Sequence, residues 1–403
     1  MSRLPCLVTV ALLAAACGGE GVAGSGGGGA GAGGGEGGST SASGGSGGGS
    51  DFDWGLPPGI PAPKVPADNP MTAEKVELGR HLFYDKRLSL NETQSCASCH
   101  LQELAFSDGK TVGIGSTGEA HPRNPMSLVN VAYLATLTWA NPSLVQLEDQ
   151  ALVPLFGEFP VELGFAGQEA ELLARLEGDD DYATAFAAAF PEAETPIALA
   201  SVVRAIAAFE RTLLSFDSAY DRYAYGGDPT ALSESARRGR DLFFSEELEC
   251  FHCHGGFNFS DSLTHEGKVI VETMFHNTGL YNIDGQGSYP EGNRGVYELT
   301  GVPSDMGRFR APTLRNIAKT APYMHDGSIA TLDEVIDHYA AGGRTIDSGP
   351  YAGVGSDNPY KSEFVTGFTI SQAQRADLIA FLESLSDDAF TENAALADPW
   401  AEP

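Results

Sequence analysis

Two stretches of this sequence decide its fold: CASCH at residues 96–100 and CFHCH at residues 250–254. Both follow the pattern C-x-x-C-H, in which two thiols bond to the two vinyl groups of one porphyrin and the adjacent histidine turns its imidazole onto the iron. The repetition favours two covalently bound c-type haems over the alternatives, which are a structural zinc site or disulfides. The predicted haem-binding residues are Cys96, Cys99, His100, Cys250, Cys253 and His254.

A second repeat precedes these motifs. Residues 79–84 read GRHLFY and residues 239–244 read GRDLFF, and each segment lies late in a helical pattern. Thr72 and Ser233 are suitable N-caps for the two helices. The two halves of the chain therefore begin with the same kind of helix, which carries a glycine and an aromatic residue.

Each half also ends in an amphipathic helix, over residues 201–214 and 371–385. This order of elements is the plan of a cytochrome c, in which the glycine lets the first and last helices cross closely. The sequence thus predicts a mostly α, loop-rich fold with two cytochrome c-like domains, each with one covalently bound c-type haem. Their expected bounds are residues 68–220 and residues 229–390.

The N-terminal residues predict export. An apolar run after Arg3 is too short to cross a membrane and is typical of a secretory signal. We expect residues 1–17 to be a signal peptide with lipidation at Cys17, because the site resembles a lipoprotein cleavage site; the alternative is a plain secreted protein. Residues 18–50 hold 19 of the 50 glycines and bury too little apolar surface to fold, which predicts a disordered tether. We therefore expect a periplasmic protein that is lipid-anchored to the outer membrane.

The charge balance limits the partners. The chain of 403 residues has 24 lysines and arginines against 54 aspartates and glutamates, which gives a formal net charge of -30. Nucleic acids and anionic membrane surfaces bind basic patches. We therefore expect no nucleic-acid partner, and membrane contact only through the lipid anchor.

Four further blocks of sequence carry a resemblance. They are PRNPMSLVN at 122–130, LEDQ at 147–150 with PVELG at 160–164, RAPTLRNI at 310–317, and TAPYMHDG at 320–327. From about residue 67 to residue 385, the chain resembles the bacterial di-haem cytochrome c peroxidases and their MauG-like relatives, and it looks most like the methanobactin-associated (MbnH-like) branch. The resemblance implies that the first haem meets hydrogen peroxide and the second handles electrons.

The resemblance also implies roles around the first haem. Glu162 matches the acid that moves a proton between the peroxide oxygens, and Gln150 matches a polar neighbour on the same side. Trp139 matches the tryptophan that lies between the haems and passes electrons. The alternatives are a solvated loop acid for Glu162 and simple core packing for Trp139. His121 is the only histidine in the loop that supplies a distal ligand in some relatives, but its spacing fits poorly, so we expect an open, five-coordinate haem.

A calcium ion commonly lies between the two domains of this family. By resemblance, its protein oxygens come from Asn124 and from the backbone carbonyls of Thr320 and Pro322. Oxygen atoms are the donors that Ca²⁺ prefers.

The second ligand of the second haem separates the branches of the family. The sequence predicts a helix that starts with a capping box at Thr331 and ends before Gly342. Tyr339 lies on the apolar face of this helix, with Leu332, Val335 and Ile336 at i, i+3 and i+4 spacing, whereas His338 lies off that face. The resemblance implies Tyr339 as the iron ligand, as in the MauG-like enzymes, where ordinary peroxidases carry Met; His338 is the rival.

Together with Tyr339, the resemblance implies an enzyme that uses hydrogen peroxide to form a high-valent state. That state would oxidise a side chain of a secreted partner protein, and we expect this side chain to be a tryptophan. A tyrosinate ligand stabilises oxidised iron, whereas methionine favours reduced iron. Two alternatives stay open. One is a detoxifying cytochrome c peroxidase that reduces hydrogen peroxide to water with electrons from a small redox protein. The other is a non-catalytic di-haem electron-transfer cytochrome.

Overall fold

The computed structural model describes residues 52–401, which belong to one compact unit, Gly48–Pro403. The predicted signal peptide at residues 1–17, the lipidation site Cys17 and the tether at residues 18–50 lie outside the described residues. None of the helices in the described part of the chain is long and apolar enough to cross a membrane.

Short helices and long loops make up this unit, which confirms the prediction of a mostly α, loop-rich fold. The sheet of the described residues has two antiparallel strands, β1 (Thr345–Ile346) and β2 (Gly353–Val354). The α-helices are α1 (Ala73–Tyr84), α2 (Leu147–Phe156), α3 (Glu169–Glu177), α4 (Asp180–Ala189), α5 (Leu199–Glu210), α6 (Ala219–Ala224), α7 (Glu234–Phe243), α8 (Cys250–Cys253), α9 (Tyr297–Thr300), α10 (Leu332–Ala340), α11 (Gln372–Glu383) and α12 (Asp388–Thr391). The 3-10 helices are η1 (Lys86–Leu88), η2 (Cys96–Ser98), η3 (Gln102–Leu104), η4 (Val131–Tyr133), η5 (Pro303–Asp305), η6 (Ile317–Lys319) and η7 (Gly355–Asp357).

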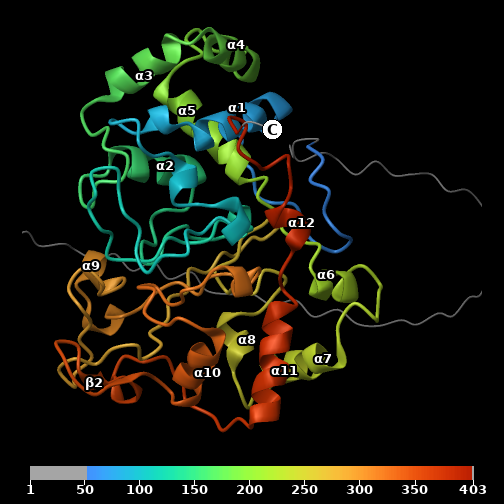
Figure 1. Ribbon diagram of the computed structural model, residues 1–403, viewed down its shortest axis with the longest axis vertical. Coiled ribbons are helices and arrows are strands. Elements are labelled where there is room, and N and C mark those ends of the chain that lie inside the picture. The colour runs from blue at the N-terminus through green and yellow to red at the C-terminus, as the bar shows by residue number, and fades with distance from the viewer. Residues whose placement is uncertain (1–51, 402–403) are drawn as a thin grey trace, which may run out of the picture. The chain divides into compact units, whose positions relative to one another are not determined.

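Two helix pairs repeat one packing arrangement (Figure 1). α1 crosses α5 at Gly79, where an added Cβ would lie 1.9 Å from the carbonyl oxygen of Ala205. α7 crosses α11 at Gly239, where an added Cβ would lie 1.8 Å from the carbonyl oxygen of Asp377. Any side chain would force each pair apart, which confirms the expected role of the two glycines.

The predicted helix starts after Thr72 and Ser233 are confirmed, and the predicted helix end at residue 214 is wrong. Thr72 and Ser233 accept N-cap hydrogen bonds from the third residue that follows each of them. The helix expected over residues 201–214 is α5, which ends four residues earlier. The backbone beyond it pairs elsewhere, because the carbonyl of Leu213 accepts a hydrogen bond from the N–H of Asn130 at 2.8 Å.

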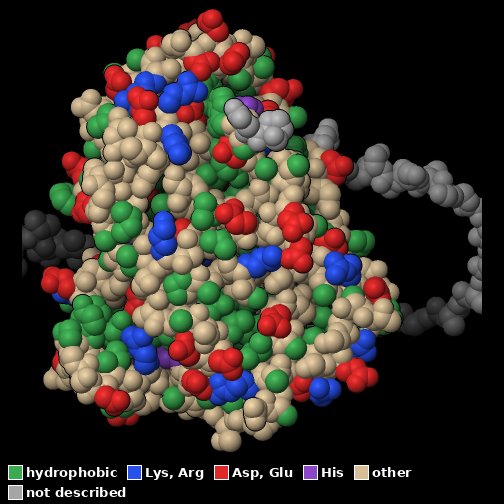
Figure 2. Space-filling view, viewed as in Figure 1, with side chains coloured by type: hydrophobic (Ala, Val, Ile, Leu, Met, Phe, Trp, Pro, Cys, Tyr) green, Lys and Arg blue, Asp and Glu red, His purple; other side chains and the backbone are tan. Residues whose placement is uncertain are grey.

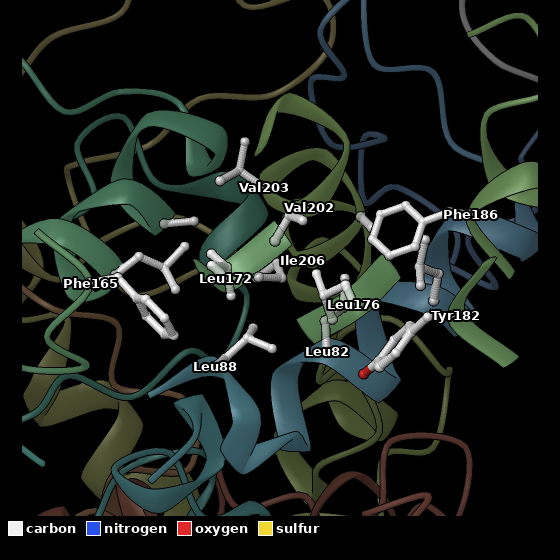
Figure 3. Close-up of a cluster of buried hydrophobic side chains, with 14 of the residues drawn as sticks. Leu82, Leu88, Phe165, Leu172, Leu176, Tyr182, Phe186, Val202, Val203 and Ile206 are labelled. Carbon is white, nitrogen blue, oxygen red and sulfur yellow. The ribbon is translucent and has the colours of Figure 1, made fainter. Parts of the chain in front are cut away.

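α3 and α4 cover the α1–α5 pair with an apolar core. In Figure 3, Leu82 of α1, Leu176 of α3, Phe186 of α4 and Ile206 of α5 lie in one cluster of buried side chains. None of these four side chains is more than 2 % exposed. This core fixes α1, and with it the chain that leads into the first C-x-x-C-H motif.

A buried ion pair joins α6 to the chain that precedes η6. The guanidinium of Arg315 donates to both carboxylate oxygens of Asp221, at 2.8 and 2.9 Å. The two side chains are 0 % and 1 % exposed. Loss of either partner would leave the other charge buried without a counter-ion.

The C-terminal segment returns to the first half of the chain. α12 places Phe390 in one core with the buried aromatic residues Phe83, Phe106 and Phe209. Further on, the hydroxyl of Tyr84 donates to the carbonyl of Leu396 at 2.8 Å. Residues after 385 therefore complete a core that the α1–α5 pair begins. The domain bounds of 68–220 and 229–390 stay a prediction.

Charged side chains of both signs are spread over the face drawn in Figure 2. On the face in Figure 2, basic side chains lie between acidic ones. The structure also contains surface ion pairs, such as Arg80 with Glu77 at 2.6 Å and Lys319 with Asp388 at 2.7 Å. The basic groups on this face are therefore dispersed rather than gathered.

Candidate haem sites

The first motif lies in the loop after α1, with its first cysteine at the start of η2. The Nδ1 atom of His100 hydrogen-bonds to the carbonyl of Phe106 at 2.9 Å, which leaves Nε2 for iron. A backbone carbonyl on the other ring nitrogen is the usual arrangement for a metal-ligating histidine. Burial lowers the pKa of His100, so the imidazole is neutral, as a ligand must be.

Glu162 stands in the loop between α2 and α3, and its backbone is held from two sides. The N–H of Leu163 donates to the carbonyl of Pro154 at the end of α2, at 2.9 Å. The carbonyl of Glu162 accepts from the N–H of Ser116 at 2.8 Å. Gln150 lies on α2, one turn before Pro154. The predicted acid and its predicted polar neighbour thus belong to one connected segment.

The Glu162 carboxyl lies beside the first motif. Burial raises its pKa to about 7, although 36 % of the side chain is exposed. Burial, with Glu162 among the nearby carboxylates, also raises the pKa of the Cys96 and Cys99 thiols. The Nδ1 atom of His121 lies 3.9 Å from a Glu162 oxygen. His121 therefore shares the surroundings of Glu162.

The second motif repeats the arrangement of the first. α8 holds its two cysteines, and His254 follows directly. The Nδ1 atom of His254 lies within hydrogen-bonding distance of two carbonyls, Phe259 at 3.2 Å and Pro312 at 3.1 Å. As in the first motif, Nε2 is left for iron, and burial lowers the pKa of the imidazole.

A large cavity adjoins this second motif. Its atom-free space is about 1720 Å³, including the part that opens to solvent. The wall contains Cys250, Cys253, His254 and Tyr339, and apolar side chains from several segments, among them Phe243, Leu248, Leu314, Ile317, Leu332, Val335, Ile336, Phe368, Leu378 and Leu382. An apolar cavity with two thiols and an imidazole in its wall fits a covalently bound porphyrin.

α10 presents the tyrosine, and not the adjacent histidine, to this cavity. The capping box at Thr331 forms as predicted, with Glu334 as its second member. Tyr339 lines the cavity with the apolar face of α10. His338 is only 4 % exposed and is absent from the cavity wall; both of its ring nitrogens lack a hydrogen-bond partner among the described side chains and backbone.

The predicted electron-transfer and calcium residues share the same cavity wall. Trp139, Asn124, Thr320 and Pro322 all line it. The indole N–H of Trp139 donates to the carbonyl of Asn124 at 2.8 Å. Within residues 52–401, no hydrogen bond reaches the carbonyl oxygens of Thr320 and Pro322. These two unpaired oxygens fit the expected cation.

Arg310, for which the sequence predicted no role, is 2 % exposed and lines the same cavity. Its Nε donates to the carbonyl of Thr138 at 3.2 Å, while Nη1 has no partner in the described part of the chain. Burial lowers the pKa of this guanidinium to about 10. A buried cation of this kind fits one of the carboxylates that every haem carries.

His276 also lies in the wall, and no pattern in the sequence marks it. It hydrogen-bonds to Asp261, and both groups lie close to the sulfur of Cys253. Burial opposes the charged imidazole, but the bonds to Asp261 and Cys253 outweigh it and raise the pKa of His276. Only the fold shows this pair, because its members lie fifteen positions apart in the chain.

The geometry does not support the two alternatives for the cysteines, which are disulfides and a structural zinc site. All four described cysteines are free of disulfides. Among the described residues, the two groups of side chains that could hold a metal contain one cysteine between them, Cys253. The two cysteines of a motif therefore do not gather with other ligands as a zinc site requires.

Comparison with known proteins places the chain in a family. Residues 73–229 match the family model described as di-haem cytochrome c peroxidase. A cytochrome-c peroxidase (IdrP1) of Denitromonas iodatirespirans is 37 % identical over 352 residues, which cover 83 % of this chain and 88 % of that protein. This chain belongs to the di-haem cytochrome c peroxidase family. The methylamine utilization protein MauG of Methylorubrum extorquens is 34 % identical and covers 85 % of each chain.

Solved structures agree with this membership. The crystal structure of a MauG-like protein associated with microbial copper homeostasis superimposes with a TM-score of 0.85 and 53 % sequence identity, over 87 % of this chain and 100 % of that one. The di-haem peroxidase BthA of Burkholderia thailandensis shares the fold, with a TM-score of 0.63 and 21 % identity. As a member of the di-haem cytochrome c peroxidase family, the chain is a peroxidase-type oxidoreductase.

Proposed function

We propose that this protein uses hydrogen peroxide to oxidise a tryptophan side chain of a secreted partner protein. The observation that carries the proposal is Tyr339, which lines the cavity of the second motif together with His254. A tyrosinate ligand favours oxidised iron and so suits an enzyme that stores oxidising power for a protein substrate. The similarity to a MauG-like protein associated with microbial copper homeostasis supports the same proposal.

Each motif would hold one haem, through two thioethers and one histidine. The ligands would be His100 for the first iron, and His254 with Tyr339 for the second. When bound, the haems supply the site at which peroxide accepts electrons and the means of holding the oxidising equivalents. Arg310 would pair with a haem carboxylate, because its Nη1 is buried and otherwise unpaired.

Glu162 would move the proton that peroxide cleavage requires. Hydrogen peroxide must first lose a proton from one oxygen, and the departing oxygen must then gain one. A carboxyl whose pKa is about 7 exists in both forms at neutral pH, so it accepts the first proton and returns it to the second oxygen. Gln150 would hold the peroxide in place by hydrogen bonding.

Trp139 would pass electrons between the two haems. A calcium ion on Asn124, Thr320 and Pro322 would hold this part of the wall in place, since Asn124 also accepts the indole N–H of Trp139. Removal of the ion with a chelator should therefore change the tryptophan fluorescence of the holoprotein and slow its reaction with peroxide. An Asn124→Ala variant that responds to the chelator as strongly as the wild type would remove Asn124 from the calcium site.

The protein would act in the periplasm, held to the outer membrane by a lipid on Cys17. The known relatives also include proteins named cytochrome-c peroxidase, which leaves peroxide detoxification with a small electron donor as the second candidate. The nature of the ligand at position 339 separates the two, since the resemblance puts methionine there in ordinary peroxidases.

The test is a redox titration of Tyr339→Met with His338→Ala as the matched neighbour. Exchange of a phenolate for a thioether should raise the potential of the second haem strongly and weaken oxidation of protein tryptophan after peroxide. His338→Ala should leave both nearly unchanged, because that side chain is absent from the cavity wall. A potential that shifts in His338→Ala and not in Tyr339→Met would make His338 the ligand and remove the main support for a protein-modifying enzyme.

A further inference from the structure

A series of aromatic rings leads from the cavity wall to the protein surface. Trp139 lies edge-on to His325, with 6.4 Å between ring centroids, and His325 lies 6.3 Å from Tyr289. Tyr289 lies 5.4 Å from Tyr281, which in turn lies 5.8 Å from Tyr351. Each step is within the contact range of packed aromatic pairs.

The inner residues of this series are buried. Tyr289 and Tyr281 are 4 % and 6 % exposed, and His325 is 5 % exposed. His325 also stacks on Phe309, with 3.6 Å between the ring centroids. Trp139 and His325 both line the cavity of the second motif, so the series starts at the wall that would face the haem.

Tyr281 differs from Tyr289 in the group that can accept its phenolic proton when the ring is oxidised. Its hydroxyl donates to a carboxylate oxygen of Asp326 at 2.6 Å, and Asp326 is 8 % exposed. The guanidinium of Arg344 lies 4.6 Å from the Tyr281 ring centroid, which opposes a positive charge on that ring. Tyr289, by contrast, donates to the amide oxygen of Asn277, which is a poor proton acceptor. A one-electron oxidation of the series would therefore settle on Tyr281, with its proton on Asp326.

Tyr351 is the outer end of the series. It lies in the loop between β1 and β2 and is 47 % exposed. Tyrosine and tryptophan are the side chains that lose an electron most readily. We propose that the Trp139–His325–Tyr289–Tyr281–Tyr351 series carries oxidising equivalents from the haem cavity to the surface, and that Tyr351 is the point at which an aromatic side chain of the partner protein is oxidised. The inference rests on the proposed function.

The electrons and protons balance at each step. Oxidised Trp139 takes one electron from Tyr281 across the rings of His325 and Tyr289, which end the step unchanged, and the phenolic proton of Tyr281 moves to Asp326. Tyr351 then returns an electron to Tyr281, which recovers its proton from Asp326, while the proton of Tyr351 passes to water. The Tyr351 radical takes an electron and a proton from the partner's side chain. Two such passes use the two oxidising equivalents of one hydrogen peroxide.

The experiment locates the radical with a spin trap. The holoenzyme is mixed with hydrogen peroxide and 2-methyl-2-nitrosopropane without a partner protein, and the adduct is mapped by mass spectrometry of its peptides. We expect the adduct on Tyr351 and its loss in Tyr351→Phe. Tyr281→Phe and Asp326→Asn should each lower its yield roughly 10²-fold, the smaller effect of a positioned proton acceptor. Tyr297→Phe is the control, because Tyr297 of α9 is partly exposed and lies outside the series.

The lifetime of the peroxide-induced absorbance change gives a second readout. Tyr351→Phe should lengthen it, because the exit is blocked, while Tyr297→Phe should not. An adduct on Tyr351 that persists undiminished in both Tyr281→Phe and Asp326→Asn would overturn the inference and leave the proposed function intact. A spin-trap adduct that forms on other residues of the wild type but not on Tyr351 would also overturn the inference. A wild-type holoenzyme that shows no absorbance change with peroxide would overturn the proposed function, and the inference with it.

Discussion

Replacement of Glu162 by glutamine tests the chemistry of the first haem site most directly. The amide has nearly the volume of the carboxyl, so the loop and its hydrogen bonds to α2 and Ser116 should remain. The variant loses the ionisable carboxyl, which can accept a proton and return it. Haem attachment and the resting spectrum should therefore match the wild type, while the reaction with peroxide slows.

The acid–base role of Glu162 determines the expected size of this effect, and the raised pKa of its carboxyl determines the pH dependence. A positioned acid–base group contributes roughly 10²–10⁴-fold to a rate, so the variant should be slower by that factor. Burial raises the pKa of Glu162 from 4.5 to about 7. Because the ionised form accepts the first proton, the ionised fraction should rise from about 10 % at pH 6 to about 90 % at pH 8. The wild-type rate should therefore increase about ninefold over this interval, with its midpoint near pH 7.

Stopped-flow absorbance after peroxide addition measures both quantities. Glu158→Gln is the matched control, because Glu158 is an exposed carboxylate in the same loop. The Glu162→Gln rate should be flat between pH 6 and pH 8, and the Glu158→Gln rate should follow the wild type. A Glu162→Gln variant with the wild-type rate and the wild-type pH dependence would refute the reasoning.

Three further changes test the scaffold. Gly239→Ala should lower the free energy of unfolding by about 1–3 kcal/mol, because the new methyl group meets a carbonyl of α11; urea denaturation measures it. Asp221→Asn should cost about 3–5 kcal/mol in the same assay, because Arg315 keeps a buried charge without a counter-ion, whereas the exposed Asp388→Asn should cost less than about 1 kcal/mol. Cys250→Ala should lose one covalent haem on haem-stained gels and in pyridine haemochrome counts; retention of both would contradict the motif assignment.

Local patterns predicted the elements that depend on neighbouring residues. The N-caps at Thr72 and Ser233, the capping box at Thr331 and the cavity-facing side of α10 all follow from residues within a few positions of one another. The close approach at Gly239 was predicted because the same glycine recurs in both halves.

The residues that the sequence could not predict meet only after folding. Arg310 reaches the cavity through the course of a long loop, and no periodicity marks it. His276 and Asp261 pair across a loop, and Tyr281 and Tyr351 meet although they lie seventy positions apart in the chain. Such contacts depend on the tertiary path of the backbone, which spacing alone does not define.

The return of the C-terminal segment sets an order on the maturation of this protein. The cysteines at 96 and 99 are synthesised long before Phe390 is available to close the core around Phe106. A haem that attaches at this stage would therefore meet these cysteines while the core is still open. Phe390 would close this core only once α12 has been synthesised, so the core around Phe106 would form after the cysteines of both motifs are available.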